Sequence, residues 1–239
     1  SDGKGMIDYA PGLKVKEYVM PETVEWIANS VFSDNKNLEI IRLSSKLTSL
    51  ACYAFNNCTS LKTVYLPENL TRIDLWAFSF SSIEEITLPS KLKVIEQVAF
   101  TNCENLKKIS FPQSIVTIDD DAFSGCTGLE SITIRKASPI VISENIFNGV
   151  KLVDGTWVNN YTYNNAVLYV PSGRSKYYKN AVGWSNFAHI EELDMPDVVI
   201  SDNPFENIEE NQMILGHYRG DECTAPNTNG FGGELPGKY

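Results

Sequence analysis

Residues 106–128 read LKKISFPQSIVTIDDDAFSGCTG, and the pattern of this stretch repeats along most of the chain. It opens with an apolar residue, two polar ones, an apolar one, a variable one and another apolar one, which is typical of a short strand with one face turned inward. Pro112 then ends the strand, because proline has no N–H to donate to a β-ladder. A second apolar pair and an alanine–phenylalanine dipeptide, which turns the chain back, complete the unit: Ile115, Ile118, Ala122 and Phe123.

The same unit recurs at spacings of 22 to 24 residues, as its phenylalanine shows: Phe32, Phe55, Phe78, Phe100, Phe123 and Phe147. One unit, 61–82, is a residue short and carries Phe80-Ser81-Ser82 where three others have a cysteine. A unit of this length cannot bury its own apolar side, but stacked units bury a continuous core and align their strands about 4.8 Å apart. We therefore expect a solenoid of about six repeats, with a parallel sheet on one side and turns or short helical pieces on the other.

The details of the repeat resemble the BspA-like leucine-rich repeat family of bacterial surface proteins. The resemblance rests on the proline after the strand, the alanine–phenylalanine pair and the NC or GC dipeptide that follows it. It extends into NAVLYVPSGRSKYYKNAVGWSNFAHIEEL (165–193), which looks like the closing segment of the family and contains an apolar plug of Trp184, Phe187 and Ile190. Over residues 13–193 it implies a right-handed α/β leucine-rich repeat superhelix, mostly β, whose last coil is covered by a C-terminal cap.

The chain divides where this pattern begins, fails and ends. We expect an N-terminal segment (1–12), leucine-rich repeats (13–151), an inserted hairpin with the C-terminal cap (152–193), and an acidic linker with a tail (194–239). The hairpin is predicted from Asp154-Gly155, a turn signal flanked by apolar alternation. The glycine-rich end of the tail has no core of its own. It either packs on the solenoid, pairs with another chain or begins a truncated following domain, and we favour truncation.

The overall charge disfavours two classes of partner. A net charge of −10 and a pI near 4.7 argue against nucleic acid, whose binding proteins need a basic face, and against anionic membrane surfaces. The sequence has no apolar run of membrane-spanning length. Because the chain starts at Ser1 rather than Met, we expect that a segment was removed from its N-terminus, and a lipid anchor in the precursor stays open.

No residue cluster in the sequence indicates catalysis, a metal or a cofactor. Cys58, Cys103 and Cys126 occupy one repeated position, which predicts small inward-facing thiols, with a Cys103–Cys126 disulfide as the alternative. The two histidines lack a nucleophile in a recognisable motif, and residues 119–121, three consecutive aspartates, lack the spacing of a calcium loop. We predict that the protein is not an enzyme and that it has no cofactor.

The outward positions of the strands are the first candidate binding surface. The column at the strand starts alternates in charge from coil to coil, which favours a structural ladder over a ligand code: Glu39, Lys62, Glu84, Lys107 and Glu130. The other columns are small and polar and predict no obvious pocket, with Tyr65 as their one aromatic residue. The candidate ligand-binding residues on this face are Arg42, Lys62, Tyr65 and Lys108.

Two further segments are candidates for partner binding. Trp157, Tyr161 and Tyr163, which we assign to the inserted hairpin, are suited to protein or glycan contacts, although the same residues could instead cover the edge of the core. In the tail, Arg219, Gly220 and Asp221 form a tripeptide of the kind that integrins bind. The surrounding residues also look like the opening of a separate domain, in which case the glycine belongs to the end of a strand.

The resemblance implies a non-catalytic protein that is secreted by a bacterium or held at its outer surface. Its partner would be a host matrix protein, a cell-surface protein or a glycan, and its role adhesion. Two alternatives stay open. The repeats could be a scaffold or targeting module for a domain beyond Tyr239, or the chain could be a self-associating structural component of the surface.

Overall fold

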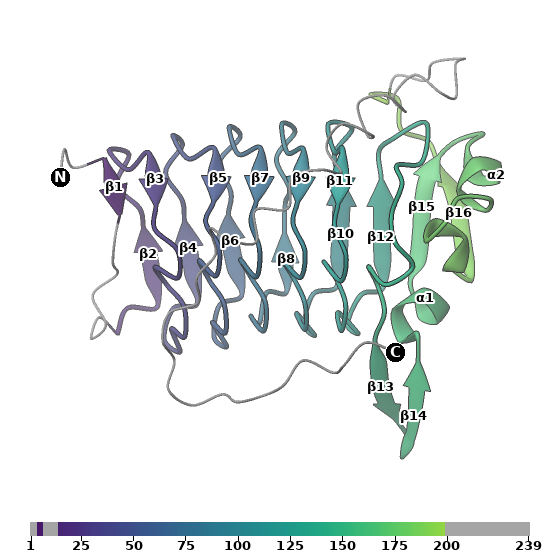
Figure 1. The fold of residues 1–239 in the computed structure, drawn as a ribbon, viewed down its shortest axis with the longest axis horizontal. Coiled ribbons are helices and arrows are strands. Elements are labelled where there is room, and N and C mark those ends of the chain that lie inside the picture. The colour runs from purple at the N-terminus through teal and green to yellow at the C-terminus, as the bar shows by residue number, and fades with distance from the viewer. Residues whose placement is uncertain (1–3, 7–13, 199–239) are drawn as a thin grey trace.

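The computed structural model describes residues 4–6 and 14–198 as an elongated stack of coils (Figure 1). One side of the stack is an eight-stranded sheet in the order β16-β15-β12-β10-β8-β6-β4-β2, and every neighbouring pair in it is parallel. Its strands are β2 (Glu17–Val19), β4 (Ile40–Arg42), β6 (Thr63–Tyr65), β8 (Glu85–Ile86), β10 (Lys108–Phe111), β12 (Ser131–Ile134), β15 (Val167–Pro171) and β16 (His189–Leu193). The first six belong to the six predicted repeats, and the last two to the closing segment.

The opposite side of the coils carries short strands where turns or short helical pieces were expected. In four of the six repeats, the second residue of the second apolar pair lies in a four-stranded parallel sheet, β11-β9-β7-β5. These strands are β5 (Ser49–Leu50), β7 (Arg72–Ile73), β9 (Val94–Ile95) and β11 (Thr117–Ile118), and β3 (Trp26–Ile27) pairs instead with β1 (Gly5–Met6). Because the period is constant, the same segments of successive coils face each other and form parallel ladders on both sides of the solenoid.

The repeated phenylalanine forms a column through the centre of the stack. All six rings are at most 1% exposed: Phe32, Phe55, Phe78, Phe100, Phe123 and Phe147. Consecutive rings lie with their centroids 5.0 to 5.5 Å apart. That distance follows from the spacing of parallel strands, so one ring per coil fills the core without a gap.

The repeated cysteines are buried free thiols, as predicted. Cys58, Cys103 and Cys126 are each fully buried, and none of the three is in a disulfide, so the alternative of a Cys103–Cys126 bond is wrong. Each thiol donates to a phenylalanine carbonyl of the preceding coil, at 3.0, 3.1 and 3.0 Å respectively. The cysteine therefore satisfies a buried acceptor at the turn while filling a small apolar space.

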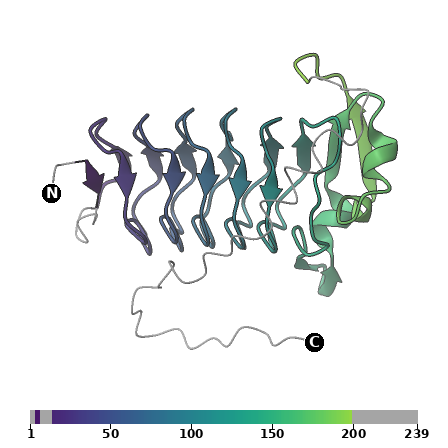
Figure 2. The same ribbon diagram turned by 45° about the horizontal axis from the view of Figure 1, so that its top comes forward.

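The closing segment covers the last coil (Figure 2). It contains α1 (Tyr161–Asn165), α2 (Ser175–Tyr178) and a 3₁₀ helix, η1 (Trp184–Asn186). Trp184 is fully buried and its indole N–H donates to the carbonyl of Ile140 at 2.8 Å, while the ring of Phe187 lies 5.3 Å from that of Phe147. The apolar plug predicted at the end of the stack is thus present, although Ile190, its third member, is only partly buried.

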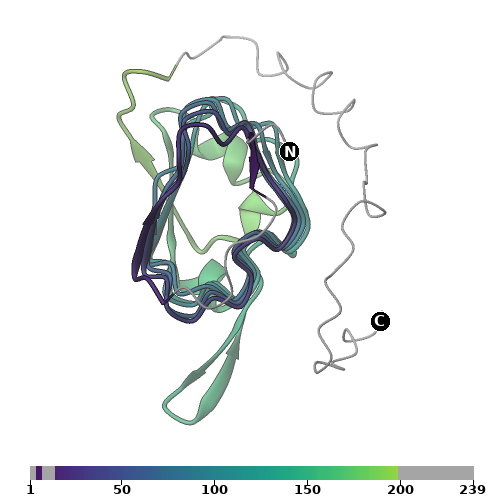
Figure 3. The ribbon, with the colours of Figure 1, turned by 90° about the vertical axis from the view of Figure 1, so that its left-hand side faces the viewer.

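A two-stranded antiparallel hairpin interrupts the last repeat, as predicted, and projects from the body of the solenoid (Figure 3). It consists of β13 (Val150–Val153) and β14 (Thr156–Asn159), so it starts two residues before the predicted boundary at 152. Asp154 and Gly155, at the turn, have φ values of 48° and 80°. Positive φ at both central residues matches the right-handed twist of a two-residue hairpin, which explains the Asp-Gly sequence.

Candidate binding surfaces

The charged column at the strand starts forms ion pairs between neighbouring coils. Lys62 and Glu84 lie 3.1 Å apart, and Lys107 and Glu130 lie 3.7 Å apart. Glu39 pairs with Lys16 of the first coil at 2.7 Å. This pairing supports the structural interpretation of the column, and it occupies Lys62, which was also a ligand-binding candidate. The side chains are exposed to solvent, which screens their attraction, so the pairs contribute little to stability.

Arg42 and Tyr65, two of the predicted ligand-binding residues, contact each other on the same face. They are register partners on β4 and β6, and the guanidinium carbon of Arg42 lies 4.2 Å from the centroid of the Tyr65 ring. The ring attracts the cation through its negative face, which fixes both side chains on the surface. Tyr65 stays 46% exposed, so the pair presents an aromatic edge and a positive charge to a ligand.

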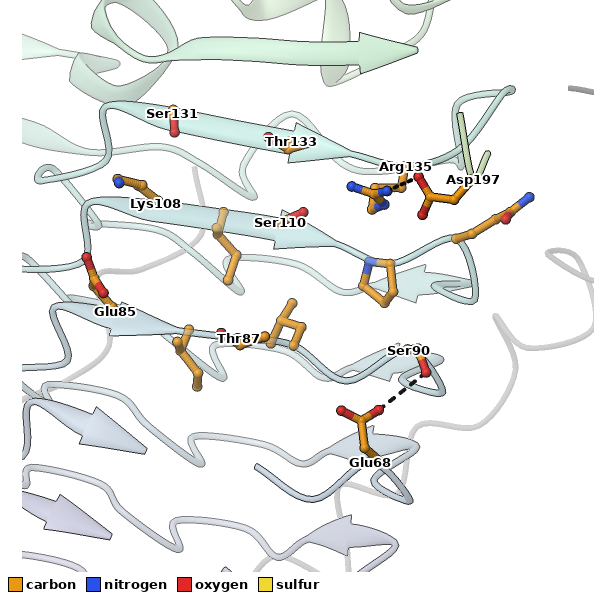
Figure 4. Close-up of a pocket in the computed structure, with 15 residues that line it drawn as sticks. Glu68, Glu85, Thr87, Ser90, Lys108, Ser110, Ser131, Thr133, Arg135 and Asp197 are labelled. Atoms are coloured by element: carbon orange, nitrogen blue, oxygen red, sulfur yellow. Dashed lines mark hydrogen bonds and ion pairs between the residues drawn. The ribbon is translucent and has the colours of Figure 1, made fainter. Parts of the chain in front are cut away.

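A hollow of about 690 Å³ lies over β8, β10 and β12, where the small polar columns predicted no pocket (Figure 4). Thr87, Ser110 and Thr133 lie next to one another in one outward column of its floor, and Ser131 is on β12 in the next column. Tyr65 precedes that column of small residues on β6, and Tyr169 follows it on β15 as the register partner of Thr133. Three small side chains thus lie between two tyrosines in this column, and the small ones form part of the floor of the hollow.

The floor of the hollow is able to bind a polar ligand. The hydroxyls of Thr87, Ser110, Ser131 and Thr133 make no hydrogen bond to any other residue that the structure describes. They belong to strands about 4.8 Å apart, so a ligand that crosses the strands can reach several of them. A hydroxyl both donates and accepts, which suits a peptide backbone or the hydroxyls of a sugar.

Charged side chains border the same hollow with opposite signs on its two sides. Glu68 and Glu85 lie on the side of β8, and Lys108 and Arg135 lie on the side of β10 and β12 (Figure 4). Lys108 and Glu85 are register partners, yet they form no ion pair within the described residues. Arg135 binds Asp197, and this contact lowers the pKa of that carboxyl. The charges of Lys108 and Glu85 thus remain available to a ligand, whereas Glu68 accepts from the Ser90 hydroxyl at 3.4 Å (Figure 4).

Of the charged residues at the hollow, only Lys108 was a predicted site residue. Arg135 could have been found from the sequence, because it continues the outward alternation of Ser131 and Thr133 by two residues. Asp197 carries no such signal. It lies in the segment that composition identifies only as a linker, and it contacts Arg135 through the course of the chain after β16.

The hairpin presents an apolar face to solvent. Val150, Leu152 and Trp157 lie on one face of it, since Leu152 is the register partner of Trp157 and Val150 that of Asn159. Trp157 is 68% exposed, and the two aliphatic side chains are also exposed. Tyr161 follows the hairpin in α1, and its ring lies 4.5 Å from the ammonium nitrogen of Lys151. Trp157 therefore lies on an element suited to partner contact.

The assignment of Tyr161 and Tyr163 to the hairpin is wrong, because both lie in α1, and Tyr163 is not exposed to a ligand. Tyr163 lies in α1 and is only 2% exposed. Its ring contacts that of Phe187 at 4.8 Å, and its hydroxyl donates to the carbonyl of Glu144 at 3.0 Å. Burial raises the pKa of this hydroxyl to about 12. The alternative, that this aromatic residue covers the edge of the core, applies to Tyr163.

The described part of the chain contains no membrane-spanning helix and no group of three or more His, Cys, Asp and Glu side chains that could hold a metal ion. Arg72 bridges the partly buried carboxylates of Asp74 and Glu96. Burial raises the pKa of Glu96 and of Asp119 on the next coil. The tripeptide Arg219, Gly220 and Asp221 lies outside the described residues.

The repeats match a known family. Six copies of the BspA type leucine rich repeat region are found over residues 25–154, which is more than half of the chain. The chain belongs to this family. The match confirms the predicted family and the count of about six repeats, and the closing segment beyond residue 154 continues the same parallel sheet.

Solved structures of bacterial leucine-rich repeat proteins have the same fold. The leucine-rich repeat protein TpLRR of T. pallidum is 22% identical with a TM-score of 0.56, covering 90% of this chain and 89% of its own. The pneumococcal vaccine antigen PcpA is 19% identical with a TM-score of 0.62, covering 82% of this chain and 45% of its own. A leucine-rich repeat protein from Bacteroides ovatus is 22% identical with a TM-score of 0.51, covering 75% and 61%. A search of curated protein sequences finds no significant match.

Proposed function

We propose that this chain is a non-catalytic binding protein, secreted by a bacterium or exposed at its surface, that attaches to a protein or glycan through the outward face of its large sheet. The observation that carries the proposal is the hollow over β8, β10 and β12, with its hydroxyl floor and with Lys108 and Glu85, which form no ion pair among the residues that the structure describes. Membership of the BspA type repeat family supports a binding role, because repeat solenoids present extended surfaces of this kind to partners.

The hollow is suited to an extended ligand that crosses the strands. Its floor follows three parallel strands, so each further residue or sugar of the ligand meets the same kind of side chain one coil further along. Arg42 with Tyr65 continues the surface toward the N-terminus of the solenoid. The exposed apolar face of the hairpin, with Trp157, is a second contact for a large partner. Aromatic residues in such positions contribute strongly to protein interfaces.

The test fills the hollow and measures adhesion. Ser110→Trp should block the floor, whereas Ser49→Trp puts the same side chain on the opposite, four-stranded sheet and is the matched control. We expect saturable binding of the unaltered protein to a purified matrix glycoprotein, mucin or an arrayed glycan. Ser110→Trp should weaken it at least tenfold, which corresponds to about 1.4 kcal/mol, and Ser49→Trp should leave it unchanged.

Two charge variants sharpen the same experiment. Lys108→Ala removes the free cation at the hollow, and Lys93→Ala removes an exposed cation beside the opposite sheet. Trp157→Ala reports on the hairpin separately. The proposal is contradicted if none of these ligands binds saturably, or if Ser110→Trp and Lys108→Ala bind as well as their controls.

A further inference from the structure

Five successive coils each have two turn positions with left-handed backbone, and none of these residues lines the hollow. The second of these positions has φ values between 56° and 75° and holds Asp34, Asn57, Phe80, Asn102 and Gly125. Aspartate, asparagine and glycine adopt this conformation more readily than other residues. Phe80 is therefore the exception in its column.

The first left-handed position is less selective, and its φ values lie between 53° and 62°. It holds Ser30, Tyr53, Trp76, Val98 and Asp121. For a bulky L-residue, left-handed backbone costs roughly 1–2 kcal/mol. One coil thus places two large aromatic residues where a small polar residue would relieve the backbone.

The rings of Trp76 and Phe80 are not part of the apolar core, so core packing does not offset the cost of the left-handed backbone. The centroids of Trp76 and Phe80 lie 6.4 Å apart with their planes within 10°, and Trp76 is stacked in the same way on Tyr53 of the preceding coil at 6.0 Å. Phe80 is 45% exposed. These aromatic residues form a surface cluster outside the central phenylalanine column. An unfavourable backbone conformation that gives no core packing points to a role in binding.

The neighbours of Phe80 leave its ring open. Asn57, on the coil before, turns its amide away and donates to Asp34 at 2.5 Å. Asn102, on the coil after, leans over Gly125, where its side-chain oxygen occupies the space that a Cβ would need. The side-chain amide of Asn102 makes no hydrogen bond within the described part of the chain, whereas its backbone N–H donates to the carbonyl of Ser124. An exposed ring is thus accompanied by a free neutral donor and acceptor.

The surroundings carry little uncompensated charge. Asp74, two residues before Trp76, and Glu96, at the same place on the next coil, are both bound by Arg72. The cluster is also small, since two or three rings cannot supply the roughly 800 Å² that each partner buries in a standard protein interface. A sugar ring has the matching size. Its C–H bonds can lie on the negative face of an aromatic ring, and its hydroxyls can bond to an amide.

We propose that Trp76 and Phe80 form a second binding site, on the turn edge of the solenoid, and that its ligand is an uncharged carbohydrate. The edge is the one from which the hairpin β13–β14 projects (Figure 1). The site is separate from the hollow, because the hollow lies on the outward face of the large sheet and none of its lining residues belongs to this cluster.

The decisive variant is Phe80→Asn, which restores the residue of Asn57 and Asn102 at the same position. It removes the ring and at the same time gives the backbone a residue that favours the left-handed conformation. We expect a melting temperature equal to or a few degrees above that of the unaltered protein. Binding to an array of neutral oligosaccharides of glucose, galactose, mannose and N-acetylglucosamine should fall at least tenfold. Trp76→Asn should behave in the same way.

Trp26→Ala is the matched control, because it removes a similarly exposed aromatic residue from β3, outside both proposed sites, and should leave oligosaccharide binding unchanged. Ser110→Trp distinguishes the two sites, since it should affect the hollow and not this cluster. A ligand titration by NMR should shift the side-chain amide signal of Asn102. The proposal is overturned if the array shows no binding, if Phe80→Asn binds as the unaltered protein does, or if that variant melts several degrees lower, which would make the ring a packing residue.

Discussion

At the residue scale, single hydrogen bonds satisfy the backbone where the chain leaves a regular strand. The repeated cysteines do so inside the stack, where each thiol donates to a carbonyl of the preceding coil. Burial raises the pKa of Cys58 to about 12, so this group stays a protonated donor. At the C-terminal end of the stack, a side-chain carboxylate satisfies backbone N–H groups. Oε2 of Glu192 accepts from the N–H of Gly173 at 2.8 Å, and Oε1 accepts from that of Ser175 at 3.0 Å.

The bonds to Glu192 predict a dependence of stability on pH. Hydrogen bonds from Gly173 and Ser175 lower the pKa of Glu192 from an ordinary value of 4.5 to about 2. A carboxyl whose folded pKa is lowered stabilises the protein above its unfolded pKa, and this contribution is lost as the pH falls through the folded value. Glu192→Gln should therefore unfold at a lower temperature than the unaltered protein at pH 6–7.

The difference in melting temperature should shrink below about pH 4.5 and vanish near pH 2. Glu191→Gln, on the same edge strand, is the control and should show no such convergence. Thermal unfolding followed by circular dichroism across this range measures both. A difference between Glu192→Gln and the unaltered protein that stays constant down to pH 2 would contradict the assignment.

At the scale of the element, the repeat coil is the unit that folds the chain. Its strand faces inward with alternate residues, its proline ends the strand, and its phenylalanine stacks on those of the coils before and after. The cost of a change therefore depends on the direction of the side chain more than on its type. An inward aromatic residue is buried against the coils on both sides, whereas an outward one keeps much of its surface in solvent.

Phe100 tests this dependence. Its ring lies 5.0 Å from those of both Phe78 and Phe123 and is fully buried. Phe100→Ala should lower the free energy of unfolding by about 3–5 kcal/mol, because it removes the buried ring and leaves a cavity. Trp157→Ala, at a residue 68% exposed, should change it by less than about 0.5 kcal/mol. Urea denaturation measures both changes, and comparable losses in the two variants would show that the column does not carry the stability.

At the scale of the whole molecule, the solenoid is a one-dimensional stack whose ends need protection. Each coil contacts mainly its neighbours, so an uncovered terminal coil would expose the apolar column. The closing segment covers the C-terminal end with Trp184, Tyr163 and Phe187. The strand at that edge, β16, carries Glu191 and Glu192 at exposed positions. Charges on an edge strand disfavour pairing with the edge of another copy, which weighs against self-association through this edge.

Trp184 is the residue on which the cap depends most. Trp184→Ala should lower the free energy of unfolding by about 3–5 kcal/mol, because a fully buried indole is lost. Trp184→Phe keeps most of the apolar area but leaves the carbonyl of Ile140 without its donor, at a cost of about 1–3 kcal/mol. Thermal unfolding with light scattering should show lower melting and earlier aggregation in the order Ala, Phe, unaltered protein. Equal melting of all three would contradict a capping role.

The sequence predicted most of the fold because the same pattern of apolar residues occurs in six successive repeats. The period places the phenylalanines, the cysteines and the strand starts above one another, and the charge alternation from Glu39 to Glu130 predicted ion pairs that the coils form. It misplaced Tyr163, because nothing in the local pattern distinguishes the exposed strand of the hairpin from the helix that turns back onto Phe147. The strands opposite the large sheet were not predicted. Each of them is only two residues long, which is too short for an alternation of apolar and polar residues to be recognised.

The candidate site is formed by side chains from several different coils, so no single repeat of the sequence contains it. The sequence by itself determined the solenoid, its family and the inward set of each coil, because these follow from a constant period and local alternation. Only the tertiary structure decided that Thr87, Ser110 and Thr133 form the floor of a hollow, and that Asp197 reaches Arg135 at its border. The physical reason is that the buried residues recur at the same position of every repeat, so the sequence reveals them. The outward residues differ from coil to coil, and the surface that they form together appears only when the coils are stacked.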